Sequence, residues 1–160
     1  MATAFDQLTL SLAGPEDGPA LQQLYRHLIA NDLEIDGAAA EAAYLRMIGH
    51  PGLSVFLGSL HGTPVTTCTL VIIPNLSRAA APYALIENVV TDAAHRSRGY
   101  GAQLVQAAIA LAWKTGCYKI MLLSGNGNAA GHRFYERLGF RTTKVGFELR
   151  AEGVPSRHPG

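Results

Sequence analysis

The sequence contains two cysteines and comparatively few charged side chains. Cys68 and Cys117 lie in apolar, strand-like segments, and two such residues do not make the disulfide framework of a small secreted domain. We therefore expect both to be reduced core residues. Charged residues make up 16% of the 160 residues, and the formal net charge is +1. This balance gives no electrostatic basis for binding nucleic acid or a membrane surface.

Long apolar runs and metal-ligand spacings are missing as well. No uninterrupted apolar run reaches the roughly 20 residues of a transmembrane helix. Residues 1–6 lack the charged-then-apolar form of a signal peptide, so we expect a cytoplasmic protein. The histidines show no metal-ligand spacing, so we expect no metal. A chain of this length predicts one domain over residues 1–160, with a frayed tail at about residues 153–160.

A basic, glycine-containing turn separates an apolar strand-like run, Leu85–Thr91, from a helix-like run, Ala102–Lys114. A helix N-terminus offers backbone N–H groups without intrahelical partners and a partial positive charge, which favour a bound anion. The glycines let the backbone approach that anion closely. The common alternative for such a turn is a solvated helix cap. We expect a phosphate-binding turn built from Arg96, Ser97, Arg98, Gly99, Tyr100 and Gly101.

A second motif follows, after the strand-like run Tyr118–Ser124. The segment Asn128–Phe140 has the form Asn-x-x-Gly-x-x-Phe-Tyr and ends in Leu-Gly-Phe. Together with the Arg-x-x-Gly-x-Gly turn, it resembles the signatures of the GNAT superfamily of acyl-CoA-dependent N-acetyltransferases over Leu85–Phe147. One departure is Gly131, where the family usually has alanine. Glycine costs about 1 kcal/mol of helix propensity there, and it leaves more room beside the cofactor.

The resemblance implies the α/β (α+β) GNAT fold, a mixed, strongly twisted central sheet flanked by helices, with splayed parallel strands holding acetyl-CoA. Apolar and alternating runs predict the strands of such a sheet, and helical periodicity predicts helices between them. The expected strands are Leu8–Leu12, Leu53–Leu60, Val65–Ile73, Tyr83–Thr91 and Tyr118–Leu123, with a final strand or hairpin over Phe140–Leu149. The inward helical residues are expected to be Ala42, Leu45 and Ile48 in Ala38–Ile48, and Leu104, Val105, Ala108, Ile109 and Ala112 in Ala102–Lys114.

The resemblance also implies an activity, the transfer of an acetyl group from acetyl-CoA to a primary amine of a small molecule. The amine attacks directly in a ternary complex, so the enzyme must hold the cofactor, deprotonate the amine, stabilise the oxyanion and protonate the thiolate. The backbone of Val89, Val90 and Thr91 is expected to bind the pantetheine arm like an added strand. The motif places Asn128 and Phe134 against the cofactor; the alternatives are a helix N-cap and a core residue.

Tyr135 matches the general acid of the family. A tyrosine with an ordinary pKa near 10 is protonated at neutral pH, and a thiol has a pKa of about 8.5. The phenol can therefore hand a proton to the departing thiolate if the two atoms lie within hydrogen-bond reach. The alternative is an aromatic side chain that only packs on the inner stripe of its helix.

Glu87 is the candidate base, because it lies inside an otherwise apolar strand, where an unpaired carboxylate is costly to bury. It is expected to activate the amine, directly or through water; the alternative is an ion pair with an arginine. Asn88 is expected to orient the substrate or bind a water. The backbone N–H of Val89 or Val90 is expected to lie beside the oxyanion.

The sequence leaves the acceptor amine, the acyl length and the oligomeric state open, with a homodimer among the options. Ile86–Val90 with Gly116–Ile120 is similar to glucosamine-phosphate N-acetyltransferases, and His132–Tyr135 to aminoalkylphosphonate acetyltransferases. One alternative is a protein acetyltransferase acting on a lysine or N-terminal amine, which would need an open groove. Another is a non-catalytic acyl-CoA-binding module, which would show no amine-dependent thiol release.

Overall fold

The structure is a computed structural model that describes residues 7–154. It divides into two compact units, Met1–Met121 and Leu122–Gly160. The prediction of one domain stays a prediction, and residues 155–160 of the expected tail lie outside the described residues. The first unit contains β1 (Thr9–Leu12), α1 (Gly18–Arg26), α2 (Gly37–Ile48), β2 (Leu53–Leu60), β3 (Thr63–Ile73), α3 (Ser77–Ala80), β4 (Tyr83–Thr91), α4 (Tyr100–Lys114) and β5 (Ile120–Met121). Short 3₁₀ turns at Pro15–Asp17 and Ala93–His95 lead into α1 and α4.

The strands of the first unit form one mixed sheet in the order β1-β2-β3-β4-β5. Neighbours pair antiparallel from β1 to β4, whereas β4 and β5 pair parallel. The turn between β2 and β3 places His61 at φ 50° and Gly62 at φ 82°, the left-handed pair that a tight hairpin requires. The five-stranded mixed sheet flanked by helices confirms the predicted fold class.

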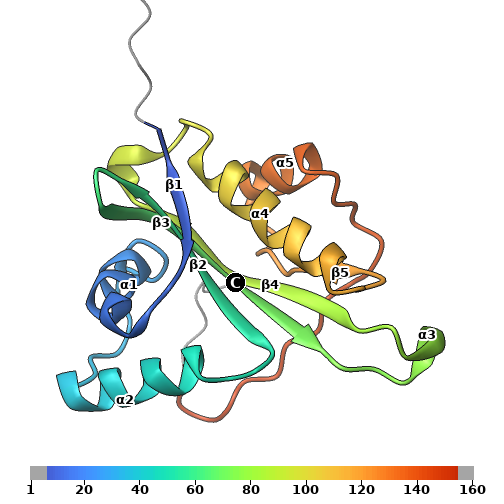
Figure 1. The fold of residues 1–160 in the computed structure, drawn as a ribbon, viewed down its shortest axis with the longest axis horizontal. Helices are drawn as coiled ribbons and strands as arrows, with labels where there is room; N and C mark the ends of the chain where they lie inside the picture. Colours follow the sequence, from blue (N-terminus) through green and yellow to red (C-terminus); the bar gives the residue numbers. More distant parts are fainter. Residues whose placement is uncertain (1–6, 155–160) are drawn as a thin grey trace, which may run out of the picture. The chain divides into compact units, whose positions relative to one another are not determined.

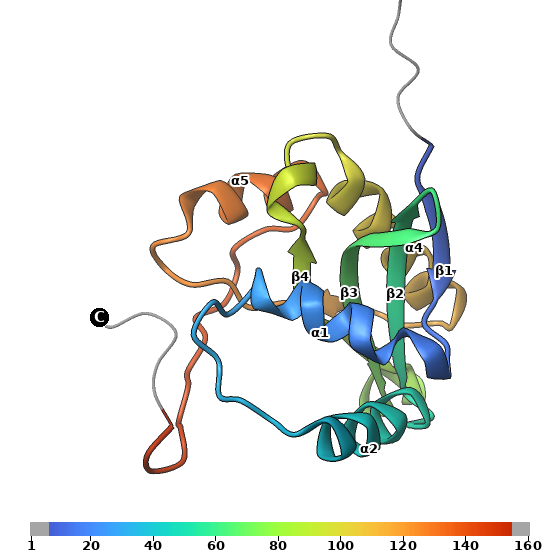
Figure 2. The ribbon, with the colours of Figure 1, turned by 90° about the vertical axis from the view of Figure 1, so that its left-hand side faces the viewer.

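Helices cover both faces of this sheet. Figure 1 shows α1 and α2 on one face and α4 on the other, and Figure 2 shows α1 crossing the strands. The α4 stripe packs on β3 and β4, as predicted, although Ile109 is only half-buried. The core beneath α1 and α2 consists of Leu21, Leu24, Tyr44, Val55, Leu57 and Val90.

The inward face of α2 differs from the prediction. Ala42 and Leu45 are exposed, and Ile48 is half-buried, whereas Tyr44 is buried. The Tyr44 hydroxyl donates a hydrogen bond of 2.6 Å to the carbonyl of Gly14. A Cβ at Gly18 would lie 2.9 Å from the Tyr44 ring, so the ring packs directly on the α1 backbone. This contact turns the helix about its axis away from the expected stripe.

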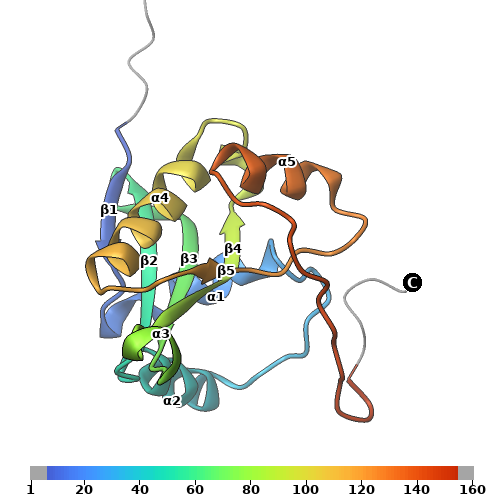
Figure 3. The same cartoon turned by 90° about the vertical axis from the view of Figure 1, so that its right-hand side faces the viewer.

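The parallel pair is shorter than predicted. β5 pairs Ile120 with Ala84 and Met121 with Leu85, and the ladder ends there. β4 continues to Thr91, so in the described part of the chain its outer edge from Ile86 onward has no strand beside it. A strand edge exposes unpaired backbone donors and acceptors to an extended ligand. Figure 3 shows β5 beside β4 and α3 at the end of the β3–β4 hairpin.

The second unit contains a single helix among its described residues, α5 (Ala129–Arg137). The predicted strand over Phe140–Leu149 is wrong, because no residue of that segment is in a strand. Its alternating side chains Val145, Phe147 and Leu149 are 81%, 93% and 100% exposed. Alternation favours a strand only when a neighbouring strand supplies hydrogen bonds and a surface to pack on. Across residues 7–154, none of the helices is long and apolar enough to cross a membrane.

Candidate functional site

A β-bulge lies in the middle of β4. Thr69 pairs with Glu87 and Thr67 pairs with Val90, so Cys68 on β3 faces both Asn88 and Val89. Asn88 takes up the extra residue at φ 50°, in the left-handed region that asparagine tolerates better than most residues. The bulge interrupts the ladder at the residues predicted to meet the substrate.

Glu87 lies directly before this bulge, and the reason given for its role is wrong. The sequence predicted a buried carboxylate, but Glu87 is exposed. None of the ion pairs among residues 7–154 includes it, so the alternative of an arginine partner is absent there. Directly paired residues share a face, and the pairs Val55–Thr69 and Thr69–Glu87 place the carboxylate on the α1 side of the sheet. Glu87 is thus a solvent-accessible carboxylate on that face.

Tyr25 on α1 is a neighbour of the bulge and lies outside both sequence motifs. The Asn88 side-chain amide donates a hydrogen bond of 3.4 Å to the Tyr25 hydroxyl. Burial raises the pKa of Tyr25, so its hydroxyl remains protonated at neutral pH. Only the fold brings these two residues together, because they are 63 positions apart; an aromatic with a polar tip on an inward stripe is the one hint in the sequence.

The turn between β4 and α4 has the backbone of an anion site. Ser97 and Gly99 both adopt positive φ, 61° and 81°, with Arg98 between them. Successive backbone N–H groups in a turn of this kind can point into one concavity. Within the described residues, the backbone N–H groups of residues 96–102 donate no hydrogen bond, and the first α4 bond of this kind runs from Gln103 to Gly99 at 3.1 Å. These groups fit the phosphate-binding prediction.

The two arginines of this turn have different surroundings. Arg96 Nε donates to the carbonyl of Thr91 at 3.0 Å, and a terminal nitrogen of its guanidinium lies 3.4 Å from the carbonyl of His27. Arg96 therefore ties the turn to the end of α1, which the sequence did not indicate. Arg98 is exposed, and its guanidinium makes no hydrogen bond or ion pair with the rest of residues 7–154. Of the two, Arg98 is the charge available to a ligand.

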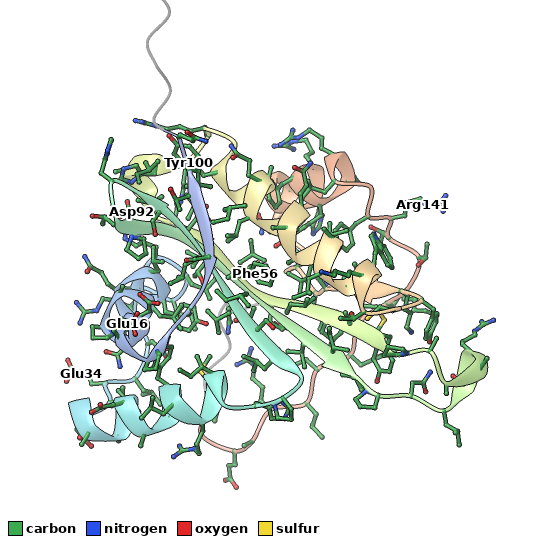
Figure 4. All side chains as sticks on the ribbon, in the orientation of Figure 1. Glu16, Glu34, Phe56, Asp92, Tyr100 and Arg141 are labelled. Carbon is green, nitrogen blue, oxygen red and sulfur yellow. The ribbon has the colours of Figure 1, made fainter. Side chains whose placement is uncertain are left out.

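Asp92 fixes the start of the same turn. Its carboxylate accepts a hydrogen bond of 2.8 Å from the N–H of Ala94 and lies 3.6 Å from His27 and 3.7 Å from His95. The Ala94 N–H, helped by the two histidines, holds the pKa of Asp92 below its ordinary value. Figure 4 shows Asp92 and Tyr100 at the same end of the sheet.

The Tyr100 side chain is a core residue. It is 4% exposed and packs with Leu60 and Val65. The ring anchors the first turn of α4 to the β2–β3 hairpin, and only the backbone of Tyr100 can contact a ligand in the turn.

The cysteines are free and buried, as predicted. Cys68 lies opposite the bulge, next to the candidate catalytic residues, and is 0% exposed. Burial raises the pKa of its thiol to about 12. The thiolate is the nucleophilic form of cysteine, so Cys68 is not equipped to carry an acyl group.

In the second unit, Asn128 is the N-cap of α5. Its side-chain oxygen accepts a hydrogen bond of 3.0 Å from the N–H of Gly131, and its amide nitrogen lies 3.4 Å from the Ser124 hydroxyl. A Cβ at position 131 would lie 2.3 Å from that amide nitrogen, closer than real contacts allow. Gly131 therefore makes room for the Asn128 side chain, which explains the departure from alanine inside this chain.

Tyr135 and Phe134 lie in an aromatic group on α5. The Tyr135 ring is 5.0 Å from Phe134 and 6.0 Å from Phe140, both in edge-to-face geometry. Both residues are half-buried. The first unit thus brings together the residues predicted from 87 to 101, and the second unit those predicted from 128 to 135; the role of each stays a prediction.

Comparison with known proteins identifies a family. The family model described as "Acetyltransferase (GNAT) family" matches residues 21–140. A curated relative, the glucosamine 6-phosphate N-acetyltransferase of Trypanosoma brucei brucei, is 34% identical over 87 residues. That match covers 54% of this chain and 57% of the relative, so it spans little more than half of either protein.

Solved structures are similar over more of the chain. A putative acetyltransferase from Agrobacterium tumefaciens is 48% identical, with a TM-score of 0.87, covering 89% of this chain and 99% of that one. A Trypanosoma brucei acetyltransferase is 26% identical, with a TM-score of 0.79, covering 91% and 100%. The folds agree along nearly the whole of both neighbours.

The packing of Gly131 against Asn128 generates a double-mutant prediction. Gly→Ala inside a helix ordinarily stabilises by about 1 kcal/mol, and loss of an asparagine N-cap costs about 1 kcal/mol. Gly131→Ala should give no net gain, because the new methyl displaces the cap. Asn128→Ala should then be destabilising in the parent chain and nearly neutral in the Gly131→Ala background. Denaturant unfolding of the four variants measures this coupling; additive effects would mean that the two side chains do not compete.

Proposed function

Because the chain belongs to the GNAT acetyltransferase family, we propose that it transfers an acetyl group from acetyl-CoA to the primary amine of a small molecule. The row of free N–H groups at residues 96–102 carries this proposal. Such a row, at the start of a 15-residue helix and beside Arg98, suits a pyrophosphate. The bound cosubstrate supplies the thioester that the amine attacks.

The open edge of β4 supports a place for the pantetheine arm. β5 leaves β4 after Leu85, and Val89, Val90 and Thr91 lie between that point and the anion-binding turn. An extended ligand can pair with such an edge as a strand does. By their positions in the second motif, we assign Asn128 and Phe134 to the cofactor as well, with the Asn128 amide nitrogen as the donor.

For catalysis we assign Glu87 as the base that takes the proton of the amine. Its exposure on the α1 face, one residue from the bulge, lets a substrate or a bridging water reach it. Asn88, held by Tyr25, orients the acceptor. The neutral, buried Cys68 supports direct attack over an acyl-cysteine route. The Tyr135 hydroxyl then gives a proton to the departing sulfur.

The first test is cofactor binding by Gly101→Glu. A carboxylate in the first turn of a helix normally favours the helix, so the fold should survive. The same charge would face the pyrophosphate, and the Kd for acetyl-CoA should rise at least about tenfold, that is by about 1.4 kcal/mol. Calorimetry measures the change, with Ala110→Glu on the exposed side of α4 as the matched control. Unchanged affinity in a folded Gly101→Glu variant would remove the pyrophosphate assignment.

The second test concerns Glu87 as base. Glu87→Gln keeps the size of the side chain and removes its proton acceptor. Turnover should fall most at low pH, where nearly all of the amine is protonated, and recover partly as rising pH supplies free amine. The pH dependence of kcat/KM measures this, and Glu41→Gln on the exposed side of α2 is the control. A profile parallel to that of the parent protein would leave Glu87 without a catalytic role.

The third test concerns Tyr135 as acid. Tyr135→Phe removes one oxygen and keeps the ring contacts with Phe134 and Phe140. General acid catalysis is typically worth about 10² to 10⁴ in rate, so turnover should fall by that factor while acetyl-CoA affinity stays near normal. Thiol release with a good amine substrate gives the rate. Near-normal turnover would make Tyr135 a packing residue.

A further inference from the structure

The turn that joins β3 to β4 has an unusual, left-handed backbone conformation. Arg78, Ala79 and Ala80 have φ of 58°, 56° and 62°, three consecutive left-handed residues without a glycine. An L-residue in this conformation is strained, and such residues normally occur singly. Strained backbone persists only where its surroundings enforce it, and it concentrates at functional sites.

Hydrogen bonds from the Asn75 side chain and two backbone bonds stabilise this conformation. The Asn75 amide nitrogen lies 2.8 Å from the Ser77 hydroxyl, 3.2 Å from the Ser77 carbonyl and 3.4 Å from the Ala81 carbonyl. Two backbone bonds, from Ala80 to Leu76 and from Ala81 to Arg78, close the turn. Arg78 therefore lies in a turn that these hydrogen bonds close.

Two cations and two aromatic rings converge beside this turn. The Arg78 guanidinium lies 5.8 Å from the centre of the Tyr118 ring. Lys119 Nζ lies 5.4 Å from that ring and 5.2 Å from the Tyr83 ring. The two rings pack edge to face at 6.4 Å. We call these four residues the Arg78–Lys119 cluster.

Among residues 7–154, no carboxylate forms an ion pair with the cations of the cluster. The sequence has no aspartate or glutamate from 42 to 86 or from 93 to 135, the stretches that contain the cluster. Two cations that contact the same ring and form no ion pair there attract an anion, and a guanidinium fork matches the oxygens of a phosphate.

Tyr83, one of the two rings of the cluster, shares a sheet face with the candidate base. Tyr83 and Glu87 are four residues apart on β4, ahead of the bulge, so their side chains point to the same face about 13 Å apart along the strand. Lys119 Nζ lies over the Tyr83 ring. Lys119 and Glu87 have long side chains, so a small phosphorylated molecule can cover the part of this span that they leave.

We propose that the Arg78–Lys119 cluster binds a phosphate group of the acceptor while the amine of the same molecule lies at Glu87. This assignment rests on the proposed function for the role of Glu87, and the class of acceptor it names is a small phosphorylated amine. Arg78 supplies the directional contact, Lys119 supplies a second charge, and the two tyrosines hold both cations in place.

The test compares an amine with and without its phosphate. Calorimetry gives Kd for glucosamine 6-phosphate and for glucosamine, with and without CoA, on the parent protein, Arg78→Gln, Lys119→Gln and the control Lys114→Gln. Charged hydrogen bonds are worth enough to predict a preference of about tenfold to a hundredfold for the phosphorylated sugar. Each cluster variant should lose most of it, and Lys114→Gln, an exposed cation on α4, should keep it.

Arg78→Lys, which keeps the charge without the fork, should lose part of the preference, and melting curves confirm that each variant folds. No preference in the parent protein, or a preference unaffected by both cluster variants, would overturn the proposal. Thiol release separates it from the proposed function. Equal kcat/KM for the two sugars would contradict the phosphate site and leave the acetyltransferase standing. Binding that depends on Arg78 without thiol release from any amine would contradict the acetyltransferase and support the phosphate site.

Discussion

β4 carries one residue more than β3 can pair, and the candidate site depends on this mismatch. Asn88 absorbs the extra residue in a left-handed conformation, and its side chain binds Tyr25. On the other edge of β4, the parallel ladder with β5 ends at Leu85. The central strand is thus paired on both edges at its beginning, whereas beyond Leu85 it pairs with β3 alone, across a bulge. A regular ladder along the whole strand would consume the backbone groups that a ligand needs.

The end of β4 is held by side chains where the ladder stops. Arg96 spans from the carbonyl of Thr91 to that of His27, and Asp92 caps the short turn before α4 while facing two histidines. The buried ring of Tyr100 packs on Leu60 and Val65 and so fixes the first turn of α4. These contacts hold the strained Ser97 in place, so the N–H groups of residues 96–102 are oriented before any ligand arrives. Such preorganisation lowers the cost of binding a phosphate.

The sequence predicted well whatever depends on local pattern. Strand Tyr83–Thr91 and the β2–β3 hairpin follow from runs of apolar residues with turn chemistry between them. The sequence-based predictions were wrong where the structure of a segment depends on residues far away in the chain. The alternation of Phe140–Leu149 predicted a strand, but the described residues offer it no neighbour. Glu87 was expected to be buried because its strand is apolar. The sequence of a strand does not show which part of the sheet face the helices leave uncovered. The Arg78–Lys119 cluster joins two residues that are 41 positions apart, which no local motif could indicate.

Nuclear magnetic resonance of ¹⁵N-labelled protein titrated with CoA tests the central claim most directly, because it observes the backbone donors themselves. The amide signals of residues 96–102 should show the largest shifts, and their hydrogen exchange should slow at least about tenfold at saturation, since bound phosphate oxygens replace water at these N–H groups. Signals in α2, such as that of Glu41, should move little. If CoA binds and shifts other amides while those of residues 96–102 stay in place and exchange at the same rate, the pyrophosphate lies elsewhere and the account of this turn is wrong.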